Sequence, residues 1–371
     1  MTQILQNSID DLLYPRKLDK IHPYPAKFTI DLAAQYIKKY SRENDVVLDP
    51  FCGSGTTLLA SRLLKRQSIG LDINFIAVLI SQFKLLNLNK KDIQELQHFI
   101  INPLYQTTKF HSYDNITHWF KQESIKALSS IKEQIYNYAQ NNEKYMTFLQ
   151  LIFSSIINIA SNQDSDTRYA SIEKPYIDEK YIFAKFNEKL KNALEIYQNI
   201  YSQDFKQSQV FLHNAKQLTQ KINKNSISLI FTSPPYPNTY DYYLYHKHRM
   251  LWLDYDVKFS MSNEIGSRRE YSSLKLPKEK FNNDLMEIFT QCNKVLKQNG
   301  MIGIVMGDGK IAGNIYNAKD EILEIATKLH WDLLDYSFSE LDKTSRSFAQ
   351  SYRTKNKKEH ILVFARNSNA N

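Results

Sequence analysis

Cysteine is scarce in this chain, which has only Cys52 and Cys292 among 371 residues. Two cysteines cannot build a disulfide framework, and their separation matches no common spacing of metal ligands. We therefore expect no metal site and no disulfide-stapled, secreted scaffold. An intracellular protein is the natural interpretation.

Long apolar runs are also missing. No stretch approaches the 18 or more consecutive apolar residues that a membrane-spanning helix needs. The first residues, "MTQILQNSIDDLLYPRK", carry acidic side chains early and lack the apolar core of a secretory signal. We therefore expect no membrane partner and no export.

Basic residues exceed acidic ones, with 48 Lys and Arg against 39 Asp and Glu and a net charge of +9. Such an excess suits a polyanionic partner such as a nucleic acid. A lysine-rich composition without functional meaning gives the same excess, so charge alone does not decide.

The order of short patterns near the N-terminus predicts an α/β fold. A strand-like run "DVVLDP" is followed by the turn "FCGSG", a helical pattern "TTLLASRLLKRQ" and a second strand "SIGLDI". This order is typical of a mostly parallel sheet with helices on its faces. The last two strands, "WDLLDYSF" and "HILVFAR", have no helix between them, so we expect them to pair as an antiparallel hairpin. Between them and the first unit, "FNNDLMEIFTQCNKVLKQNG" predicts a helix that Gly300 terminates.

The pattern changes in the middle of the chain. Stretches such as "IKALSSIKEQIYNYAQ" and "FNEKLKNALEIYQNIY" predict long helices, separated by an irregular loop. We therefore expect a largely helical insertion over 91–204, with 1–90 and 205–371 forming one catalytic domain.

Gly53 and Gly55 lie directly after a predicted strand and before a helix. Glycines let the backbone turn tightly beside a ligand, and a helix N-terminus attracts negative charge. The sequence has no triphosphate-binding loop, and the third glycine of a dinucleotide fingerprint is missing. These features favour a ligand with a compact anionic end, such as a carboxylate; an ordinary strand–helix turn is the alternative.

Two polar residues follow other predicted strands. Asp72 ends the second strand, where a carboxylate accepts both hydroxyls of a ribose; an N-cap of the next helix is the alternative, and both roles can hold at once. Asn214 follows "SQVFLH", where it is placed to hydrogen-bond an adenine edge or to serve as a turn residue.

The strand-like run "SISLIFT" stops at Ser233, Pro234, Pro235 and Tyr236. Prolines cannot donate to a sheet ladder, so the strand must end there on a stiff backbone. We refer to residues 233–236 as the ledge. A hydroxyl and an aromatic ring on a rigid strand end predict a catalytic site.

Taken together, "DPFCGSGTT" and "TSPPY" resemble the DNA amino-methyltransferases. The resemblance implies a Rossmann-like methyltransferase fold, S-adenosylmethionine as cofactor and double-stranded DNA as partner. The segment "HPYPAKF" resembles the family's motif over the methionine end of the cofactor, and "KKEHILVFAR" resembles its last core strand. His213 and Asn214 stand where the family commonly has an acidic residue. The implied cofactor contacts are Lys27, Phe28, Asp49, Phe51, Gly53, Gly55, Thr56, Asp72 and Asn214.

A serine at the first ledge position resembles the cytosine-N4 branch, whereas the adenine-N6 branch usually has Asp or Asn there. The cytosine amine is a poor nucleophile, and we expect the Ser233 hydroxyl and the Pro234 carbonyl to accept its N–H groups. Tyr236 would stack on the target base once it has left the duplex. Methylation at carbon 5 needs a cysteine nucleophile, and neither Cys52 nor Cys292 lies in a Pro-Cys motif.

Aromatic and basic residues after the ledge suit stacking and phosphate contacts. Some of them must instead pack a helix, since Tyr245, Arg249 and Trp252 fall on one helical face. For reading bases we prefer the 91–204 insertion over the 254–280 loop. The candidate nucleic-acid contacts are Tyr240, Lys247, Arg249, Arg268, Arg269 and Arg346.

The sequence therefore predicts a DNA methyltransferase specific for cytosine N4, in a bacterial cytoplasm and within restriction–modification or a related defence system. A cognate restriction endonuclease is a further candidate partner. Three alternatives stay open: adenine-N6 methylation, methylation of a base amino group in RNA, and a non-enzymatic DNA-binding protein.

Overall fold

The computed structural model describes residues 13–25, 27–107, 109–199, 207–340 and 357–367. The chain divides into two compact units. The sheet unit comprises Ala26–Val78, Lys206–Tyr243 and Phe259–Asn371, and the helical unit comprises Met1–Pro25, Leu79–Phe205 and Leu244–Lys258.

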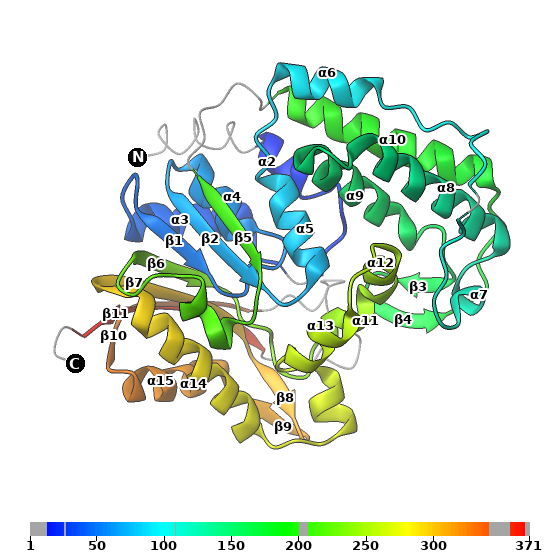
Figure 1. The fold of residues 1–371 in the computed structure, drawn as a ribbon. Coiled ribbons are helices and arrows are strands. Elements are labelled where there is room, and N and C mark those ends of the chain that lie inside the picture. The colour runs from blue at the N-terminus through cyan, green and yellow to red at the C-terminus, as the bar shows by residue number, and fades with distance from the viewer. Residues whose placement is uncertain (1–12, 26, 108, 200–206, 341–356, 368–371) are drawn as a thin grey trace. The chain divides into compact units, whose positions relative to one another are not determined.

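The described part of the sheet unit contains a seven-stranded sheet of order β10-β11-β7-β6-β1-β2-β5 (Figure 1). The strands β5, β2, β1, β6 and β7 are parallel, whereas β11 runs antiparallel to both β7 and β10. The predicted fold, a mostly parallel sheet closed by a C-terminal antiparallel hairpin, is confirmed. The strands are β1 Val46–Asp49, β2 Gln67–Asp72, β5 Ser208–Leu212, β6 Ile227–Thr232, β7 Leu296–Gly307, β10 Trp331–Glu340 and β11 Lys358–Arg366.

Helices cover both faces of this sheet (Figure 1). On one face, α3 (Ile30–Tyr40) packs against α4 (Thr56–Leu63). On the other, α14 (Lys278–Val295) and α15 (Ala318–Lys328) share a continuous apolar core with the strands. The short helix η1 (Ala215–Gln220) joins that core.

The helix α14 ends earlier than the sequence predicts. It stops at Val295, and Gly300 lies inside β7 instead of terminating the helix. The reason is tertiary: Leu296 is fully buried and pairs in register with Ile227 of β6. Pairing with a neighbouring strand therefore outweighs the local helix-stop signal.

The helical unit is built on long amphipathic helices. In it, α10 packs against α6, α8 and α9, and the side chains of Asn142 and Asp178 cap α9 and α10 by accepting from Tyr145 N and Tyr181 N. Fully buried Phe148, Ile152 and Phe186 form part of its core. Its elements are α2 Leu13–Leu18, α6 Lys90–His98, α7 Ile116–Trp119, α8 Gln122–Ala139, α9 Glu143–Ile157, β3 Gln163–Ser165, β4 Arg168–Ser171, α10 Glu179–Gln198 and α12 Lys247–Trp252.

Shorter elements complete the described chain. Three helices, α5, α11 and α13, begin in one unit and end in the other. They and the remaining elements are α5 Phe75–Lys84, α11 Tyr242–Tyr245, α13 Val257–Asn263, η2 Arg269–Ser273, β8 Gly309–Ile311 and β9 Asn314–Tyr316.

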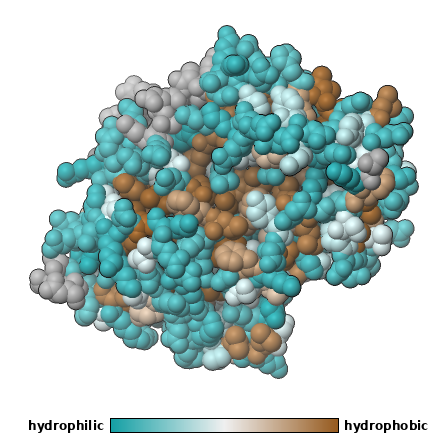
Figure 2. Space-filling model, viewed as in Figure 1, coloured by the Kyte–Doolittle hydropathy of each residue, from teal (hydrophilic) through white to brown (hydrophobic). Residues whose placement is uncertain are grey.

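The face shown in Figure 2 is covered mainly by hydrophilic residues, with smaller hydrophobic areas between them. Single large apolar side chains such as Ile100, Leu104 and Ile315 are exposed. No helix in the described ranges is long and apolar enough to cross a membrane.

Candidate active site

The predicted site residues gather at one edge of the sheet. Asp49, Asp72 and Thr232 are the last residues of β1, β2 and β6, which are parallel neighbours. Their carboxyl ends therefore lie at the same edge, where ligands bind in open α/β sheets.

The glycine turn after β1 adopts the conformation that its residues allow. Gly53 and Gly55 have φ angles of 48° and 78°, in the left-handed region. The turn is closed by a hydrogen bond from Gly55 N to Cys52 O of 2.7 Å. This backbone leads directly into α4 at Thr56. A glycine turn at a helix N-terminus fits the predicted contact with an anionic group of a ligand.

Asp72 holds this turn in place. Its carboxylate accepts hydrogen bonds from Gly53 N at 2.9 Å and from Asn74 N at 2.8 Å. Burial raises the pKa of Asp72 to about 6, while these N–H groups oppose the shift. Asp72 thus organises both the glycine turn and the entry to α5, and its contact with a ribose stays a prediction.

Asp49 connects the glycine turn with the strand that carries the ledge. Its Oδ1 accepts from Phe51 N at 3.1 Å and from the Thr232 hydroxyl at 2.6 Å. Burial raises the pKa of Asp49 to about 6, against the opposing hydrogen bonds from Thr232 and Thr57. Because Ser233 follows Thr232 directly, one carboxylate fixes both the predicted cofactor turn and the predicted catalytic segment.

Two buried polar atoms near this edge have no protein partner among the described residues. They are the Thr56 hydroxyl, at the start of α4, and the Asn74 side-chain nitrogen, just after β2. Buried polar atoms normally have a hydrogen-bond partner. Such atoms beside the glycine turn suit a ligand with polar groups, so the residues present fit S-adenosylmethionine.

Phe28 lies beside the same strand. Its ring meets the Phe231 ring edge-on, with centroids 5.6 Å apart, and Tyr36 stacks on Phe231 at 5.5 Å. The described part of the "HPYPAKF" motif therefore reaches the end of β6. Lys27 is exposed, and its contact with a cofactor stays a prediction.

Asn214 is engaged as the turn alternative predicts. Its side chain accepts from Lys216 N at 2.9 Å and caps η1. Its side-chain nitrogen donates to Asn263 Oδ1 at 2.6 Å. A contact with adenine would have to compete with that bond, so this role stays a prediction.

The segment that follows the ledge is anchored on several sides. Asn238 has a left-handed φ of 57° and donates from its backbone to Gly266 O at 2.8 Å. Its side-chain nitrogen donates to Lys310 O at 2.8 Å, and its oxygen accepts from the Ser272 hydroxyl at 2.7 Å. Pro234 is buried, while Ser233 and Pro235 are half-buried. Together these contacts hold the ledge still from its C-terminal side.

Tyr236 is held by two residues that the sequence patterns did not single out as site residues. Its hydroxyl donates to Glu359 Oε1 at 2.6 Å, and its ring packs on Gly307. Burial and the Glu359 carboxylate raise the pKa of Tyr236 well above its ordinary value. One side of the ring is therefore covered, and stacking on a target base stays a prediction.

Glu264 is a further buried carboxylate that sequence reasoning missed. It accepts from Tyr242 N at 2.6 Å and Tyr243 N at 3.2 Å, just beyond the ledge. Burial raises its pKa to about 8, and the charges of Asp241 and Asp72 add to the shift. No local motif marks Glu264, because its partners lie some twenty residues away in the chain.

Replacing Glu264 with glutamine should flatten the pH dependence of stability. A folded-state pKa raised from 4.5 to about 8 gives stability that is present below pH 4.5 and lost as the pH rises through 8. Asp49 and Asp72 act the same way up to about pH 6. Between pH 6 and 8 we expect the thermal midpoint of the wild type to fall by about 5 °C more than that of the E264Q variant.

Differential scanning fluorimetry at pH 6, 7 and 8 measures this difference. Glu279, exposed in the first turn of α14, provides the matched control variant E279Q, which should follow the wild type. Equal pH dependence in the E264Q variant and the wild type would show that Glu264 does not titrate in this range.

Two of the predicted nucleic-acid contacts are buried. Arg249 is only 1% exposed and pairs with Asp166 inside the helical unit, so its prediction as a phosphate contact is wrong. As the alternative expects, it is buried on a helix with Trp252, although Tyr245 ends the separate helix α11. Tyr240 is 8% exposed and lies against Tyr242, so it does not present an exposed ring to DNA.

The other predicted nucleic-acid contacts differ in exposure. Arg269 is exposed, and Arg268 is half-buried. Lys247 is half-buried, with its ammonium 5.6 Å from the centre of the Tyr169 ring. Arg346 lies outside the described residues. The roles of these four residues stay predictions.

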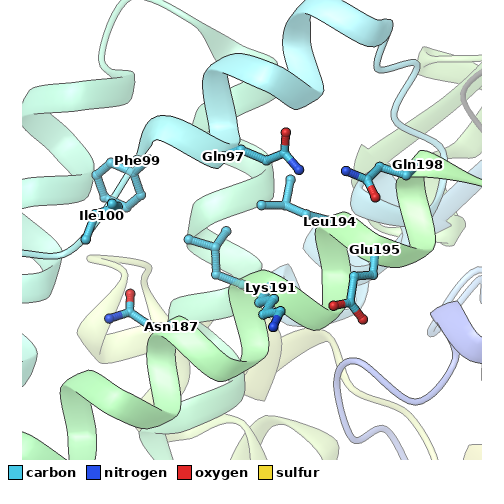
Figure 3. Close-up of a pocket in the computed structure, with 9 residues that line it drawn as sticks. Gln97, Phe99, Ile100, Asn187, Lys191, Leu194, Glu195 and Gln198 are labelled. Carbon is cyan, nitrogen blue, oxygen red and sulfur yellow. The ribbon is translucent and has the colours of Figure 1, made fainter.

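The helical unit contains a pocket of about 550 Å³ between α6 and α10 (Figure 3). Phe99, Leu190 and Leu194 supply apolar surface, and Gln97, Asn187 and Glu195 supply polar groups. None of the predicted catalytic or cofactor residues lines it.

A glycine turn after β1, an aspartate ending β2 and a proline ledge after β6 define a Rossmann-like methyltransferase. The N6/N4 methyltransferase family model, described as DNA methylase, matches residues 6–83 and 227–371. The chain belongs to this DNA methylase family. Its membership confirms the predicted cofactor, S-adenosylmethionine.

Several characterised proteins are similar to this chain. Type II methyltransferase M.MjaII of Methanocaldococcus jannaschii is 33% identical over 141 residues, which are 37% of this chain and 24% of that protein. M.MvaI of Kocuria varians is 24% identical over 64% of this chain and 58% of its own length. M.BsoBI of Geobacillus stearothermophilus is 26% identical over 63% of this chain and 52% of its own. The chain thus spans less than two thirds of each relative.

Proposed function

We propose that this protein transfers a methyl group from S-adenosylmethionine to the exocyclic N4 of cytosine within a specific site of double-stranded DNA. The Asp49–Thr232 hydrogen bond of 2.6 Å is the observation that carries the proposal. It ties the turn suited to the cofactor to the residue that precedes Ser233. The methyl donor and the acceptors for the amine would then lie at the same edge of the sheet.

The ledge supplies what this reaction needs from the protein. The Ser233 hydroxyl oxygen and the Pro234 carbonyl would accept the two N–H groups of the cytosine amine. These bonds would direct the nitrogen lone pair away from the ring and towards the methyl group. S-adenosylmethionine supplies an electrophilic methyl group on a sulfonium. Serine is too weak a base to remove the proton first, so the amine would lose its proton to solvent during or after methyl transfer, and S-adenosylhomocysteine would be the leaving group.

The same edge would hold the cofactor. The backbone of the Gly53–Gly55 turn suits its carboxylate, and the Thr56 hydroxyl has a free hydrogen-bonding capacity beside that turn. Asp72 would accept from the ribose. Asp49 is buried and Asp72 is half-buried, and both carboxylates would complement a positively charged cofactor.

Contacts with DNA would be divided between two parts of the chain. Residues 91–204 contain 12 Lys and Arg against 14 Asp and Glu, so the whole positive excess of the chain lies outside them. Phosphate contacts would therefore come mainly from the rest of the chain, including Arg268 and Arg269. The insertion over 91–204 stays our candidate for reading bases, which depends on hydrogen bonding more than on charge.

The biological setting that we propose is restriction–modification in a bacterium, with a cognate restriction endonuclease as partner. The names of the relatives, type II methyltransferases, support this setting. Adenine N6 is the second candidate target, because the family includes both N6 and N4 enzymes and one ledge residue carries much of the distinction.

The product of the reaction tests the proposal. The purified chain is incubated with methyl-labelled S-adenosylmethionine and genomic DNA from a bacterium that lacks DNA methylation. The DNA is then digested to nucleosides, which are identified by mass spectrometry. N4-methylcytosine supports the proposal, N6-methyladenine supports the second candidate, and a product formed only on RNA offered in parallel supports an RNA methyltransferase. Absence of any product contradicts all three.

A further inference from the structure

We propose that Glu359 is a positioning residue for methyl transfer: by accepting the Tyr236 hydroxyl, it fixes the tyrosine ring on Gly307 and so orients the ledge. This inference rests on the proposed function. It adds a residue from β11, the last strand along the chain, to a site otherwise built from β1, β2 and β6.

The first support is the contact itself. The Tyr236 hydroxyl donates to Glu359 Oε1 at 2.6 Å, across 123 positions of the chain. Both residues are only partly exposed, so water competes weakly for this bond. A hydrogen bond to a carboxylate is among the stronger ones in proteins.

The second support is the backbone on which Glu359 stands. Glu359 lies opposite Gly307 in the antiparallel pairing of β11 with β7. Asp308 ties both neighbours of Glu359: it accepts from Lys358 N at 3.1 Å, and its Oδ1 lies 3.1 Å from His360 Nε2. The backbone that carries the Glu359 carboxylate is therefore held in place on both sides.

The third support is the fit of the ring. A side-chain carbon added at Gly307 would lie 2.6 Å from the Tyr236 ring, closer than van der Waals contact permits. The ring thus rests directly on the backbone of β7. The hydroxyl held by Glu359 and the ring resting on Gly307 together fix the observed orientation of Tyr236.

The position of Tyr236 matters because it is three residues from Ser233 on a stiff Pro-Pro segment. A rotation of Tyr236 would be transmitted to the serine hydroxyl and the Pro234 carbonyl. Misplacement by about 1 Å at a reacting group costs roughly a hundredfold in rate. The sheet itself does not need the Glu359 side chain, because its pairing uses backbone groups.

A set of variants tests this inference: E359A, E359Q, Y236F and the double variant Y236F/E359A. We expect E359A and Y236F each to lower the single-turnover methylation rate by about 10- to 100-fold. E359Q should retain most of the rate, because its amide oxygen still accepts. The double variant should be no slower than either single variant, since both remove the same bond. The affinity for S-adenosylmethionine, measured by calorimetry, should change little.

Glu340 provides the matched control. It is exposed at the same end of the neighbouring strand and pairs in register with Lys358. The E340Q variant should methylate like the wild type. An E359A variant with the wild-type rate would overturn the inference, as would a double variant whose loss is the product of the two single losses. Loss of rate with equal loss of cofactor affinity and a lower thermal midpoint would also overturn it, by showing a merely structural role.

A measurement without substrate separates this inference from the proposed function. With 3-fluorotyrosine at position 236, the ¹⁹F signal should be sharp and shifted in the wild type and in E340Q, and should move towards the free-tyrosine value in E359A. An unchanged signal in E359A overturns the inference even where no methylation is found. A wild type that methylates no nucleic acid, together with the expected ¹⁹F change, contradicts only the proposed function.

Discussion

Replacing Ser233 with alanine is expected to lower the rate of methyl transfer by about 10²- to 10³-fold, the usual effect of removing one preorganised hydrogen-bonding group from an active site. The serine hydroxyl is small and half-buried, so its removal leaves the ledge intact. The affinity for S-adenosylmethionine should stay within about twofold, because the contacts that we assign to the cofactor lie outside the ledge, chiefly in the glycine turn after β1 and at the end of β2.

Single-turnover kinetics with unmodified genomic DNA measure the rate, and calorimetry measures cofactor affinity. Ser228, near the start of β6, the strand that leads into the ledge, is the matched control: its hydroxyl donates to Asp45 at 2.9 Å, away from the ledge. The S228A variant should therefore methylate at the wild-type rate. An S233A variant that turns over like the wild type would remove Ser233 from the reaction and with it the proposed role of the ledge.

Patterns local in the sequence were sufficient for the sheet and for the core of the site. "DVVLDP", the glycine turn and "SISLIFTSPPY" each place functional residues directly after a strand. In a parallel sheet, neighbouring strand ends meet at one edge without further information. Asp49, Asp72 and Ser233 could therefore be predicted before their geometry was known.

Residues whose partners lie far away in the sequence are not indicated by any local sequence pattern. Glu359 reaches Tyr236 only because β11 folds back beside β7, and Glu264 bonds backbone groups of Tyr242 and Tyr243 after the two helices α12 and α13. A single glutamate in a strand or a loop is most simply explained as a solvent-exposed residue without a role in the site. Only the folded structure connects either residue with the ledge region.

Arg249 is a different kind of error: the sequence predicts it at the surface because its side chain is charged. The same residue also fitted the apolar face shared by Tyr245 and Trp252, and that periodicity gave the correct location. A buried arginine requires partners, which come from segments far away in the sequence: Ser154 and Asp166. A charged side chain is expected at the surface unless other residues offer it hydrogen-bond and ion-pair partners in the interior.

Replacing Arg249 with alanine should therefore destabilise the protein by about 3 kcal/mol, the lower end of the cost of removing one partner of a buried ion pair, because 35% of the Asp166 side chain is exposed. Arg249 donates to Ser154 O at 3.2 Å, to His246 Nδ1 at 3.3 Å and to the Asp166 carboxylate. Burial, together with the neighbouring Arg249 charge, lowers the pKa of His246 to about 3, so its ring is neutral and accepts. All three acceptors would lose a donor at once.

Urea unfolding followed by circular dichroism measures this loss, and the R168A variant is the matched control. Arg168 forms an exposed pair with Asp164 at 3.2 Å, with 72% of its side chain accessible, and its removal should cost well under 1 kcal/mol. Burial alone would raise the pKa of Asp166, but Arg249 and the Asn158 amide hold it below its ordinary value. The stability lost in R249A should therefore shrink in strongly acidic solution, because protonation of Asp166 removes the charge that Arg249 pairs with. A stable R249A variant that binds DNA more weakly, with a reduced salt dependence, would instead return Arg249 to the protein surface as a phosphate contact.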